Sequence, residues 1–354
     1  MSGTTVSWFT APRGGTDPRP ARLWLKIFAA GFVLIVGLLI VTLRTPPFFG
    51  DMTRIGLLSE NAFGWTIEPP QVPDQYLAAV PVSEADVLVI GDSFSMSNRW
   101  QSELVRSGLR VTTIFWGQIA EALCGDFDAW LDKAGFKGKT VVIESVERLL
   151  AERLANSQNC KKMQKPFTAG TKPFFAPLDH VPPPAVNWDG KLTSGLNIYR
   201  NTERARKATG DFLSNKRILV RPVADGCSMF SSRLCDRAPF WPADDENGEL
   251  TPQHVAQMRA IGEAHPKRSL VWMVIPNKTT VYVKPEHSKD FVTALGASGL
   301  GPDLFGFSQE QKKQVRDYYF PNDTHLSMHG QLAVGKRMLE AVRKTQPAPP
   351  SKDS

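Results

Sequence analysis

The longest run of apolar positions in the chain lies near its N-terminus. It extends from Leu23 to Leu43 (LWLKIFAAGFVLIVGLLIVTL) and contains a single charged residue, Lys26. A helix rises about 1.5 Å per residue, so about 20 mostly apolar residues cross the roughly 30 Å of hydrocarbon in a bilayer. Lys26 is near enough to one end to place its ammonium group among the headgroups. The pattern predicts one transmembrane helix over residues 23–43.

The residues on either side of this run indicate its orientation. Arg13, Arg19 and Arg22 precede it with one acid, Asp17, and basic flanks stay on the cytoplasmic side. The run is longer than the about 7–15 residues of a cleaved signal peptide, and residues 44–47 (RTPP) offer no small-residue cleavage site. We therefore expect an uncleaved single-pass anchor with a cytoplasmic N-terminus, and everything after it to be exported.

Beyond residue 81, short apolar runs alternate with amphipathic stretches. Strands are predicted at residues 86–90, 110–115, 140–143, 217–223 and 270–275. Helices are predicted at residues 119–134, 145–156, 252–264, 286–295 and 327–344, and one more from Ser93 towards Ser107. Buried strands separated by helices are typical of a three-layer α/β fold with a mostly parallel sheet, in which ligands bind at the carboxyl ends of the strands.

The same pattern divides the chain into segments. They are a cytoplasmic tail (1–22), the membrane helix (23–43), a proline-bearing linker (44–81), one exported domain (82–345) and a C-terminal tail (346–354). Between about residues 157 and 215 the strand–helix alternation stops, and Pro, Lys, Phe and Asn become frequent. A long surface insertion is predicted there, and such insertions often carry function.

Composition and charge narrow the function classes. The chain has 354 residues, a net charge of +7 and no run of five basic residues, so nucleic-acid binding is not expected. Its cysteines all follow the membrane run and none has CxxC spacing, which argues against a zinc or thioredoxin-like motif; they are Cys124, Cys160, Cys227 and Cys235. In an oxidising compartment Cys227 and Cys235 can close a short loop, which leaves Cys124 with Cys160. Other pairings and free buried thiols remain open.

Two loops carry the residue types of nucleophilic catalysis. Gly91-Asp92-Ser93 directly follows the strand at 86–90, where a serine can meet exposed backbone amides suited to an oxyanion. Asp323-Thr324-His325 precedes the last helix, for which Ser327 is a candidate N-cap. A serine hydroxyl needs a base to accept its proton, and the base needs an acceptor that holds its other ring nitrogen. Ser93, His325 and Asp323 together supply these three roles.

Together the two loops resemble the SGNH (GDSL-type) hydrolase superfamily and, more narrowly, the alginate O-acetyltransferase family, through GDSFS at Gly91–Ser95 and DTH at Asp323–His325. Val141–Leu150 (VVIESVERLL) and Ile275–Tyr282 are similar to further motifs of that family, so the resemblance extends roughly from Asp86 to Arg343. In soluble alginate acetyltransferases the Asp-x-His loop comes first, whereas the order here is the usual SGNH order. The resemblance implies an SGNH/flavodoxin-like fold and, with the membrane helix, a place in a bacterial inner membrane with the folded domain in the periplasm.

It also implies an activity, which is transfer of an acetyl group to a polysaccharide hydroxyl through an acetyl-serine at Ser93. His325 would act as base and then acid, Asp323 would orient it, and the amides of Ser93 and Gly117 would bind the oxyanion. The implied partners are an exopolysaccharide such as alginate or cellulose, a membrane-bound acyltransferase that donates the acetyl group, and a glycan synthase complex. No cofactor is expected.

Further residues are candidates for substrate binding. Arg148, Lys278 and Tyr282 lie in the two additional motifs. Arg148 belongs to the stretch Glu144–Arg148, which stands where the superfamily has an asparagine, although it can equally pair with Glu144 or Glu152 on a helix surface. Lys278 can equally be an ordinary loop cation. Aromatic residues that can stack on sugars are Trp188, Phe240 and Trp241.

Three other interpretations stay open. With water in place of the sugar hydroxyl, the same triad makes an O-acetyl esterase, because the acceptor is selected by water exclusion and pocket shape. The missing asparagine of the superfamily leaves room for a non-catalytic, glycan-binding subunit of a synthesis machine. Asp323, His325 and His329 could instead hold a metal ion. That last arrangement gives the Gly-Asp-Ser loop no purpose, so no metal is expected.

Overall fold

The computed structural model describes residues 18–168 and 178–345 and contains a central parallel sheet. The four strands, in spatial order, are β2 (Val111–Phe115), β1 (Val87–Gly91), β3 (Thr140–Val146) and β7 (Ser269–Ile275). Every neighbouring pair is parallel. The predicted α/β class with a mostly parallel sheet is therefore confirmed.

Both faces of this sheet are covered. Successive side chains of a strand point to opposite faces, and Leu88 and Ile90 of β1 belong to one apolar cluster while Val87 and Val89 belong to another. Side chains of helices at residues 127–134, 147–158, 252–264 and 289–298 contribute to the first cluster, and side chains of helices at residues 102–106, 278–282 and 328–343 contribute to the second. This double burial explains why the strands are almost continuously apolar.

The helices around the parallel sheet are short or of medium length. They are α4 (Ser102–Arg106), α5 (Phe127–Ala134), α6 (Glu147–Gln158), α10 (Pro252–Ala264), α11 (Lys278–Tyr282), α12 (Lys289–Ser298), α13 (Leu304–Gln314) and α14 (Met328–Arg343). Single 3₁₀ turns are η1 (Asp74–Tyr76), η2 (Val82–Glu84) and η3 (Trp116–Ile119). Ser327 caps α14 as predicted, since its Oγ accepts from the Gly330 amide at 3.3 Å.

Two predicted helices are wrong in their extent. The helix expected from Ser93 begins only at Ser102, because the Asp92 side chain accepts from the Phe94 amide at 3.1 Å and holds the intervening residues in turns. The helix expected from residue 119 begins only at Phe127. Ala120 and Glu121 both have positive φ (55° and 56°), a conformation that a right-handed helix does not contain.

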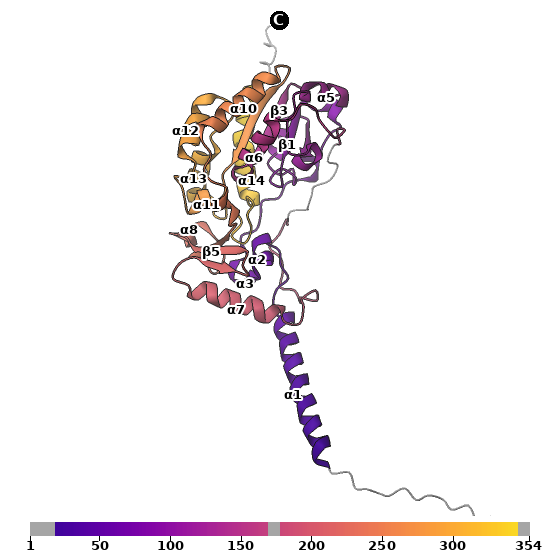
Figure 1. Ribbon diagram of the computed structural model, residues 1–354, viewed down its shortest axis with the longest axis vertical. Coiled ribbons are helices and arrows are strands. Elements are labelled where there is room, and N and C mark those ends of the chain that lie inside the picture. Colours follow the sequence, from indigo (N-terminus) through magenta and orange to yellow (C-terminus); the bar gives the residue numbers. More distant parts are fainter. Residues whose placement is uncertain (1–17, 169–177, 346–354) are drawn as a thin grey trace, which may run out of the picture.

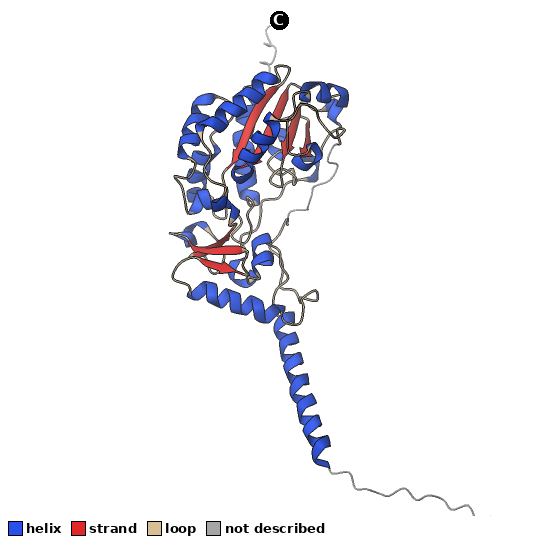
Figure 2. Cartoon of the chain, viewed as in Figure 1, coloured by secondary structure: helices blue, strands red, loops and turns tan. Residues whose placement is uncertain are grey.

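A second, antiparallel sheet lies between the N-terminal helix and the parallel sheet (Figures 1 and 2). Its strands are β4 (Phe212–Ser214), β5 (Ile218–Pro222) and β6 (Arg237–Phe240), and the helices of this region are α2 (Asp51–Gly56), α3 (Glu60–Phe63), α7 (Ser194–Lys207), α8 (Gly226–Met229) and α9 (Ala243–Glu246). A third apolar cluster unites α2, α3, α7 and β5. The sequence predicted β5 alone of these strands.

The predicted linker and insertion are both partly wrong. Residues 44–81 contain α2 and α3, and Met52, Leu58 and Phe63 are fully buried in the third cluster. The insertion at 157–215 contains α7 and β4, and Ile198 and Ala205 of α7 are buried. Helices α2 and α3 and strand β4 have six, four and three residues, too few to show a period, whereas α7 has 14 residues and was missed. Residues 1–17 of the predicted cytoplasmic tail, residues 169–177 and the tail 346–354 lie outside the described residues.

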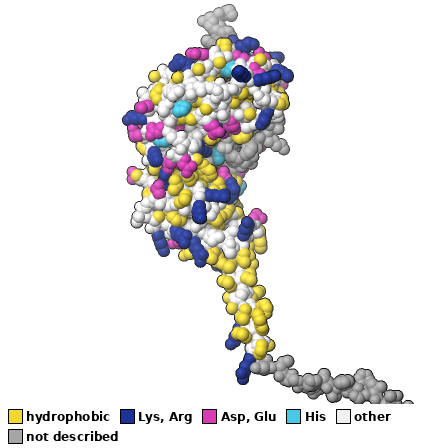
Figure 3. All heavy atoms as spheres, in the orientation of Figure 1, with side chains coloured by type: hydrophobic (Ala, Val, Ile, Leu, Met, Phe, Trp, Pro, Cys, Tyr) yellow, Lys and Arg dark blue, Asp and Glu magenta, His cyan; other side chains and the backbone are white. Residues whose placement is uncertain are grey.

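Helix α1 (Pro18–Leu43) matches the predicted membrane span closely. Its part from Arg19 to Leu43 is long and apolar enough to cross a membrane. It projects from the folded body with its apolar side chains exposed, and basic side chains lie at its N-terminal end (Figures 1 and 3).

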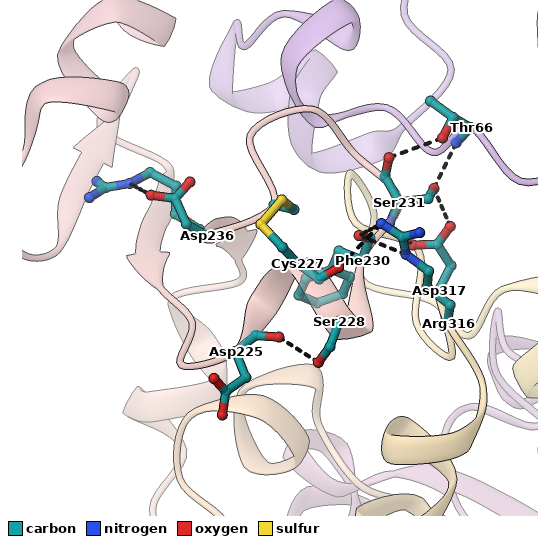
Figure 4. The surroundings of a disulfide bond; sticks show 11 residues. Thr66, Asp225, Cys227, Ser228, Phe230, Ser231, Asp236, Arg316 and Asp317 are labelled. Carbon is teal, nitrogen blue, oxygen red and sulfur yellow. Dashed lines mark hydrogen bonds and ion pairs between the residues drawn. A yellow bond between two sulfur atoms is a disulfide. The ribbon is translucent and has the colours of Figure 1, made fainter.

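Both disulfides of the favoured pairing are present, Cys124–Cys160 and Cys227–Cys235. The second closes a loop that packs against the chain leading to the Asp-Thr-His loop (Figure 4). Arg316 Nη2 donates to the Cys227 carbonyl at 3.2 Å, and the Ser231 amide donates to Asp317 Oδ1 at 2.7 Å. The Asp317 amide in turn donates to the Met229 carbonyl at 2.7 Å. The disulfide loop thus fixes where the Asp-Thr-His loop begins.

Candidate active site

Ser93, His325 and Asp323 form a continuous hydrogen-bonded series. Ser93 Oγ lies 2.7 Å from His325 Nε2, and His325 Nδ1 lies 2.6 Å from Asp323 Oδ1. Ser93 comes directly after β1, and the other two residues come directly before α14, so the series joins elements 232 positions apart in sequence. Ser93 is half-buried, which leaves its hydroxyl reachable, whereas His325 is buried beside the Phe94 ring. This is the geometry that nucleophilic catalysis by a serine requires.

The charges in this series are set by burial and by each other. Burial opposes ionisation of Asp323, but the neighbouring His325 and the hydrogen bonds to the carboxylate outweigh it and lower its pKa to about 2. Burial likewise opposes protonation of His325, yet the Asp323 carboxylate raises the histidine's pKa above its ordinary value. Asp323 therefore stays ionised over the neutral range, and His325 is a stronger base than a free imidazole.

Glu144, near the carboxyl end of β3, forms hydrogen bonds with the loop that contains Ser93 (Gly91–Ser95). One oxygen of its carboxyl group, Oε2, accepts from the Asp92 amide at 2.7 Å and from Ser95 Oγ at 2.9 Å. Trp100 Nε1 donates to the same Ser95 hydroxyl at 3.0 Å. Burial and the nearby Asp92 carboxylate raise the pKa of Glu144 well above its ordinary value. These contacts fix the backbone on both sides of Ser93.

A buried ion pair between Arg153 and Asp92 supports the same loop. Arg153 Nη1 on α6 lies 2.9 Å from Asp92 Oδ2 and donates to Ser145 Oγ at 2.7 Å. The Val146 amide also donates to Asp92 Oδ2, at 3.0 Å. Burial opposes the charge on Asp92, but Arg153 outweighs it and keeps the pKa of Asp92 below its ordinary value. Asp92 is thus a structural anchor for the loop rather than a helix cap.

We expect Arg153→Met to destabilise the protein by about 3–5 kcal/mol, because it leaves the Asp92 carboxylate buried without a counter-charge. Urea denaturation of the full chain in detergent measures this change. The double variant Asp92→Asn/Arg153→Met removes both charges and should regain much of the lost stability. A single variant within about 1 kcal/mol of wild type would mean that Asp92 does not depend on Arg153.

Lys278, a predicted substrate-binding residue, is instead fully buried beneath the Asp-Thr-His loop. Its Nζ donates to four carbonyls, those of Pro239, Phe320, Pro321 and Asp323, at 2.8–3.1 Å. Burial lowers its pKa to about 7. The substrate-binding prediction is therefore wrong for Lys278, which holds the backbone that presents Asp323.

The substrate-binding prediction is also wrong for Tyr282, which is 7% exposed and packs in the second apolar cluster. Its hydroxyl accepts from the Tyr319 amide at 3.3 Å, and its ring lies 4.6 Å from that of Phe230. Both candidate residues of the Ile275–Tyr282 motif are thus buried and support the Asp-Thr-His loop, where a substrate cannot reach them.

For Lys278→Met we expect a loss of about 3 kcal/mol in stability, because carbonyls that now accept from the ammonium would be left buried without a donor. The substrate KM should stay near its wild-type value, while kcat falls as the loop loosens. Lys133→Met, on the exposed side of α5, is the matched control and should change neither. A raised KM with unchanged stability would restore the substrate-binding interpretation.

Arg148 lies close to the triad. Its charge partly opposes the rise in the pKa of His325 that Asp323 causes, and its side chain is only 12% exposed. It pairs with Asp244 of α9, with Nη1 3.2 Å from Oδ1, and not with Glu144 or Glu152 as the helix-surface alternative required. Its predicted contact with substrate stays a prediction.

Gly117 lies on η3, after β2, at the same sheet edge as Ser93. Its carbonyl accepts from Lys165 Nζ at 2.8 Å, and among the described residues no hydrogen bond connects it to Ser93. The oxyanion role of the Ser93 and Gly117 amides stays a prediction. The helix terminus expected to support it is absent, since Ser93 lies in a turn.

The predicted sugar-stacking aromatics are not gathered at this site. Phe240 is fully buried in the second cluster, which makes that prediction wrong. Trp241 packs partly buried against the third cluster. Trp188 is 79% exposed and precedes α7, where the chain contacts the end of α1.

The sequence missed the contribution of the segment that follows α1. The Asp51 amide donates to Asp323 Oδ2 at 2.8 Å, and the Met52 amide donates to the Asn322 carbonyl at 3.2 Å. Asn322 Nδ2 donates to Glu60 Oε2 at 2.7 Å. Burial raises the pKa of Glu60 to about 7. Nothing in the local pattern of residues 49–63 indicates contact with a loop some 270 positions away.

The metal alternative also changes. His329 lines a separate surface pocket with Phe307 and Lys336, away from the triad. Asp51, Asp323 and His325 do place one ligand-type atom each within 4.8 Å of one another. However, both carboxylate oxygens of Asp323 already accept hydrogen bonds, and both ring nitrogens of His325 face Ser93 or Asp323. This donor set favours proton transfer over metal binding.

Comparison of the chain with protein-family models, with curated proteins and with solved structures found no match. A function for the chain is therefore proposed from the sequence motifs and the geometry of the site.

Proposed function

We propose that the chain is a membrane-anchored O-acetyltransferase of SGNH type that modifies an exported polysaccharide. The observation that carries this proposal is the Ser93–His325–Asp323 series, with its 2.7 and 2.6 Å separations. The half-buried serine, the ionised aspartate and the strengthened histidine base are the properties that acyl transfer needs. The same three residues lie in the GDSFS and DTH motifs through which the chain resembles alginate O-acetyltransferases.

The reaction proceeds in two displacements. Ser93 Oγ attacks the acyl carbonyl while its proton moves to His325 Nε2, and the proton then passes to the departing alcohol, which leaves an acetyl-serine. A sugar hydroxyl next attacks that ester, gives its proton to His325 Nε2, and departs acetylated as the proton returns to Ser93. Water in place of the sugar gives acetate, so the esterase alternative uses the same steps.

The surroundings of the triad support an exported, membrane-bound enzyme. Both disulfides form in an oxidising compartment, and α1 supplies one apolar helix of spanning length. The order of elements, with the nucleophile after the first strand and the Asp-x-His loop before the last helix, supports the three-layer SGNH fold as part of the proposal. Acetyl-CoA is cytosolic, so we infer that a membrane-bound acyltransferase donates the acetyl group beside a glycan synthase.

A covalent adduct tests this function directly. The full chain is incubated with a chromogenic acetyl ester, alcohol release is followed, and intact mass is recorded after rapid quenching. We expect a burst of release together with one added acetyl group. A folded protein that gives neither burst nor adduct, and that also resists a serine-directed fluorophosphonate, would contradict the proposal and favour the glycan-binding subunit.

A further inference from the structure

Helix α7 is fixed to the C-terminal end of α1. Thr42 Oγ1 donates to the Leu192 carbonyl at 2.9 Å and accepts from the Gly195 amide at 3.2 Å. A Cβ on Gly195 would lie 2.7 Å from Thr42 Cα, so only glycine permits this approach. Figure 1 shows α7 lying across the end of α1 rather than continuing it. If α1 crosses a membrane, α7 therefore lies along the membrane surface.

Exposed apolar side chains gather at the same level. Outside α1, the large hydrophobic residues that are exposed in the described part of the chain are Val186, Trp188, Leu192, Tyr199 and Leu213. All except Leu213 lie in the segment that packs on the end of α1 or in α7 itself, and Leu213 lies in β4, which contacts α7. Single exposed hydrophobic residues are ordinary, but a group beside a membrane helix that includes Trp and Tyr is typical of the membrane interface.

A cavity of about 700 Å³ lies beside the end of α1, between α7 and residues 59–62 and 233–234 of the folded body. Its lining includes one acid, Glu203, and combines apolar residues with arginines, among them Val41, Ile198, Leu234, Arg44, Arg206 and Arg233. The three arginines are exposed, and Glu203 pairs with Arg206 at 2.7 Å. Guanidinium groups bind phosphate in bidentate fashion, and the apolar wall begins in the last turns of the membrane helix. This mixture matches a phospholipid, which has a phosphate at the surface and acyl chains below it.

The outer side of α7 adds further positive charge. Its buried positions follow helical spacing, at Gly195, Ile198, Thr202 and Ala205, and they face the small sheet and α1. The other side carries three exposed basic residues, Arg200, Arg204 and Lys207. Basic residues held at a bilayer surface are attracted to anionic lipids by about 1 kcal/mol each. The charge therefore favours acidic over neutral lipids.

We propose that this membrane-proximal face, formed by residues 186–207 and the cavity beside them, binds the anchoring bilayer, with the headgroup of an anionic phospholipid in that cavity. Trp188 then lies at the interface instead of stacking on a sugar. This inference depends on α1 crossing a membrane and is independent of the chemistry at Ser93. It gives the folded body a second attachment that fixes its tilt and height above the membrane.

Lipid retention by the full chain tests the proposal. The protein in detergent is mixed with phosphatidylglycerol or with phosphatidylcholine of identical acyl chains, and bound lipid is counted by native mass spectrometry. We expect preferential retention of phosphatidylglycerol, reduced about tenfold or more in Arg44→Gln/Arg206→Gln/Arg233→Gln, since the loss of even one charge-assisted contact to phosphate is worth about that factor. The triple variant Lys133→Gln/Lys137→Gln/Lys139→Gln, with the same loss of charge at exposed positions far from α1, should retain it fully.

The remaining outcomes are decisive as well. Equal retention of both lipids, or an arginine variant that retains phosphatidylglycerol like wild type, would overturn the proposal. Glycerol 1-phosphate, which lacks acyl chains, separates a lipid site from a site for soluble phosphates; efficient displacement of the lipid by it would also overturn the proposal. Hydrolysis of an acetyl ester, measured in parallel, should be unchanged in the arginine variant, so failure here leaves the proposed function untouched.

Discussion

Ser93→Ala is expected to lower ester turnover by about 10⁵–10⁶-fold and to abolish the acetyl adduct. Removal of the nucleophile from a serine triad costs about this much, because the other members act only through it. The residual rate would come from substrate binding and oxyanion contacts alone. Turnover of a chromogenic acetyl ester and intact mass after quenching measure the two effects.

The same loop offers a matched control in Ser95. This serine is fully buried and its hydroxyl already bonds to Glu144 and Trp100, so it cannot reach a substrate. Ser95→Ala should still form the adduct, although less support for the loop slows turnover. An adduct that persists in Ser93→Ala and disappears in Ser95→Ala would show that the wrong serine has been assigned.

Asp323→Asn is expected to reduce kcat/KM by about 10⁴-fold and to move its pH dependence. An amide in place of the carboxylate no longer holds His325 in the tautomer that accepts a proton from serine. In the wild type the base works only when neutral, so activity rises with pH through a pKa held above the ordinary 6.5 by Asp323. Without that charge, burial lowers the pKa of His325, and the inflection moves to lower pH.

A pH–rate profile of the full chain provides this measurement. Asp290→Asn, at an exposed position on α12, removes the same charge far from the site and should reproduce the wild-type profile. An Asp323→Asn profile with the wild-type inflection would mean that another group sets the basicity of His325, and an undiminished rate would remove Asp323 from the mechanism.

That Ser93 and His325 come together could be predicted from the sequence because each lies at a recognisable boundary. Ser93 follows an apolar strand and His325 precedes a capped helix, and parallel strands end at a common edge. The supporting residues could not be found in this way. Lys278 and Glu144 have the same side chains whether they face substrate or the protein interior, and only the packing of distant segments decides which.

Some helices and strands could likewise be predicted from local sequence, and others could not. Helix α10 has the bounds that were predicted, since Thr251 and Pro252 mark its start locally. The strands of the small sheet have between three and five residues, too few to show alternation. The sequence after Ser93 predicts a helix. In the structure the Asp92 side chain binds Arg153 and the Phe94 amide, and the residues after Ser93 form turns instead.

The hydrogen bond from the Asp51 amide to Asp323 has a consequence for proteolytic release from the membrane. A protease that cuts just after α1, within residues 44–47, would shed a soluble fragment that keeps this donor and the buried residues of α2 and α3. A cut a few residues later, beyond Asp51, would free a fragment of nearly the same mass that lacks this donor but keeps the buried residues of α3. Under the proposed function, the first fragment would diffuse with its full activity and the second with less support for Asp323, so the position of the cut would set how active the shed fragment is.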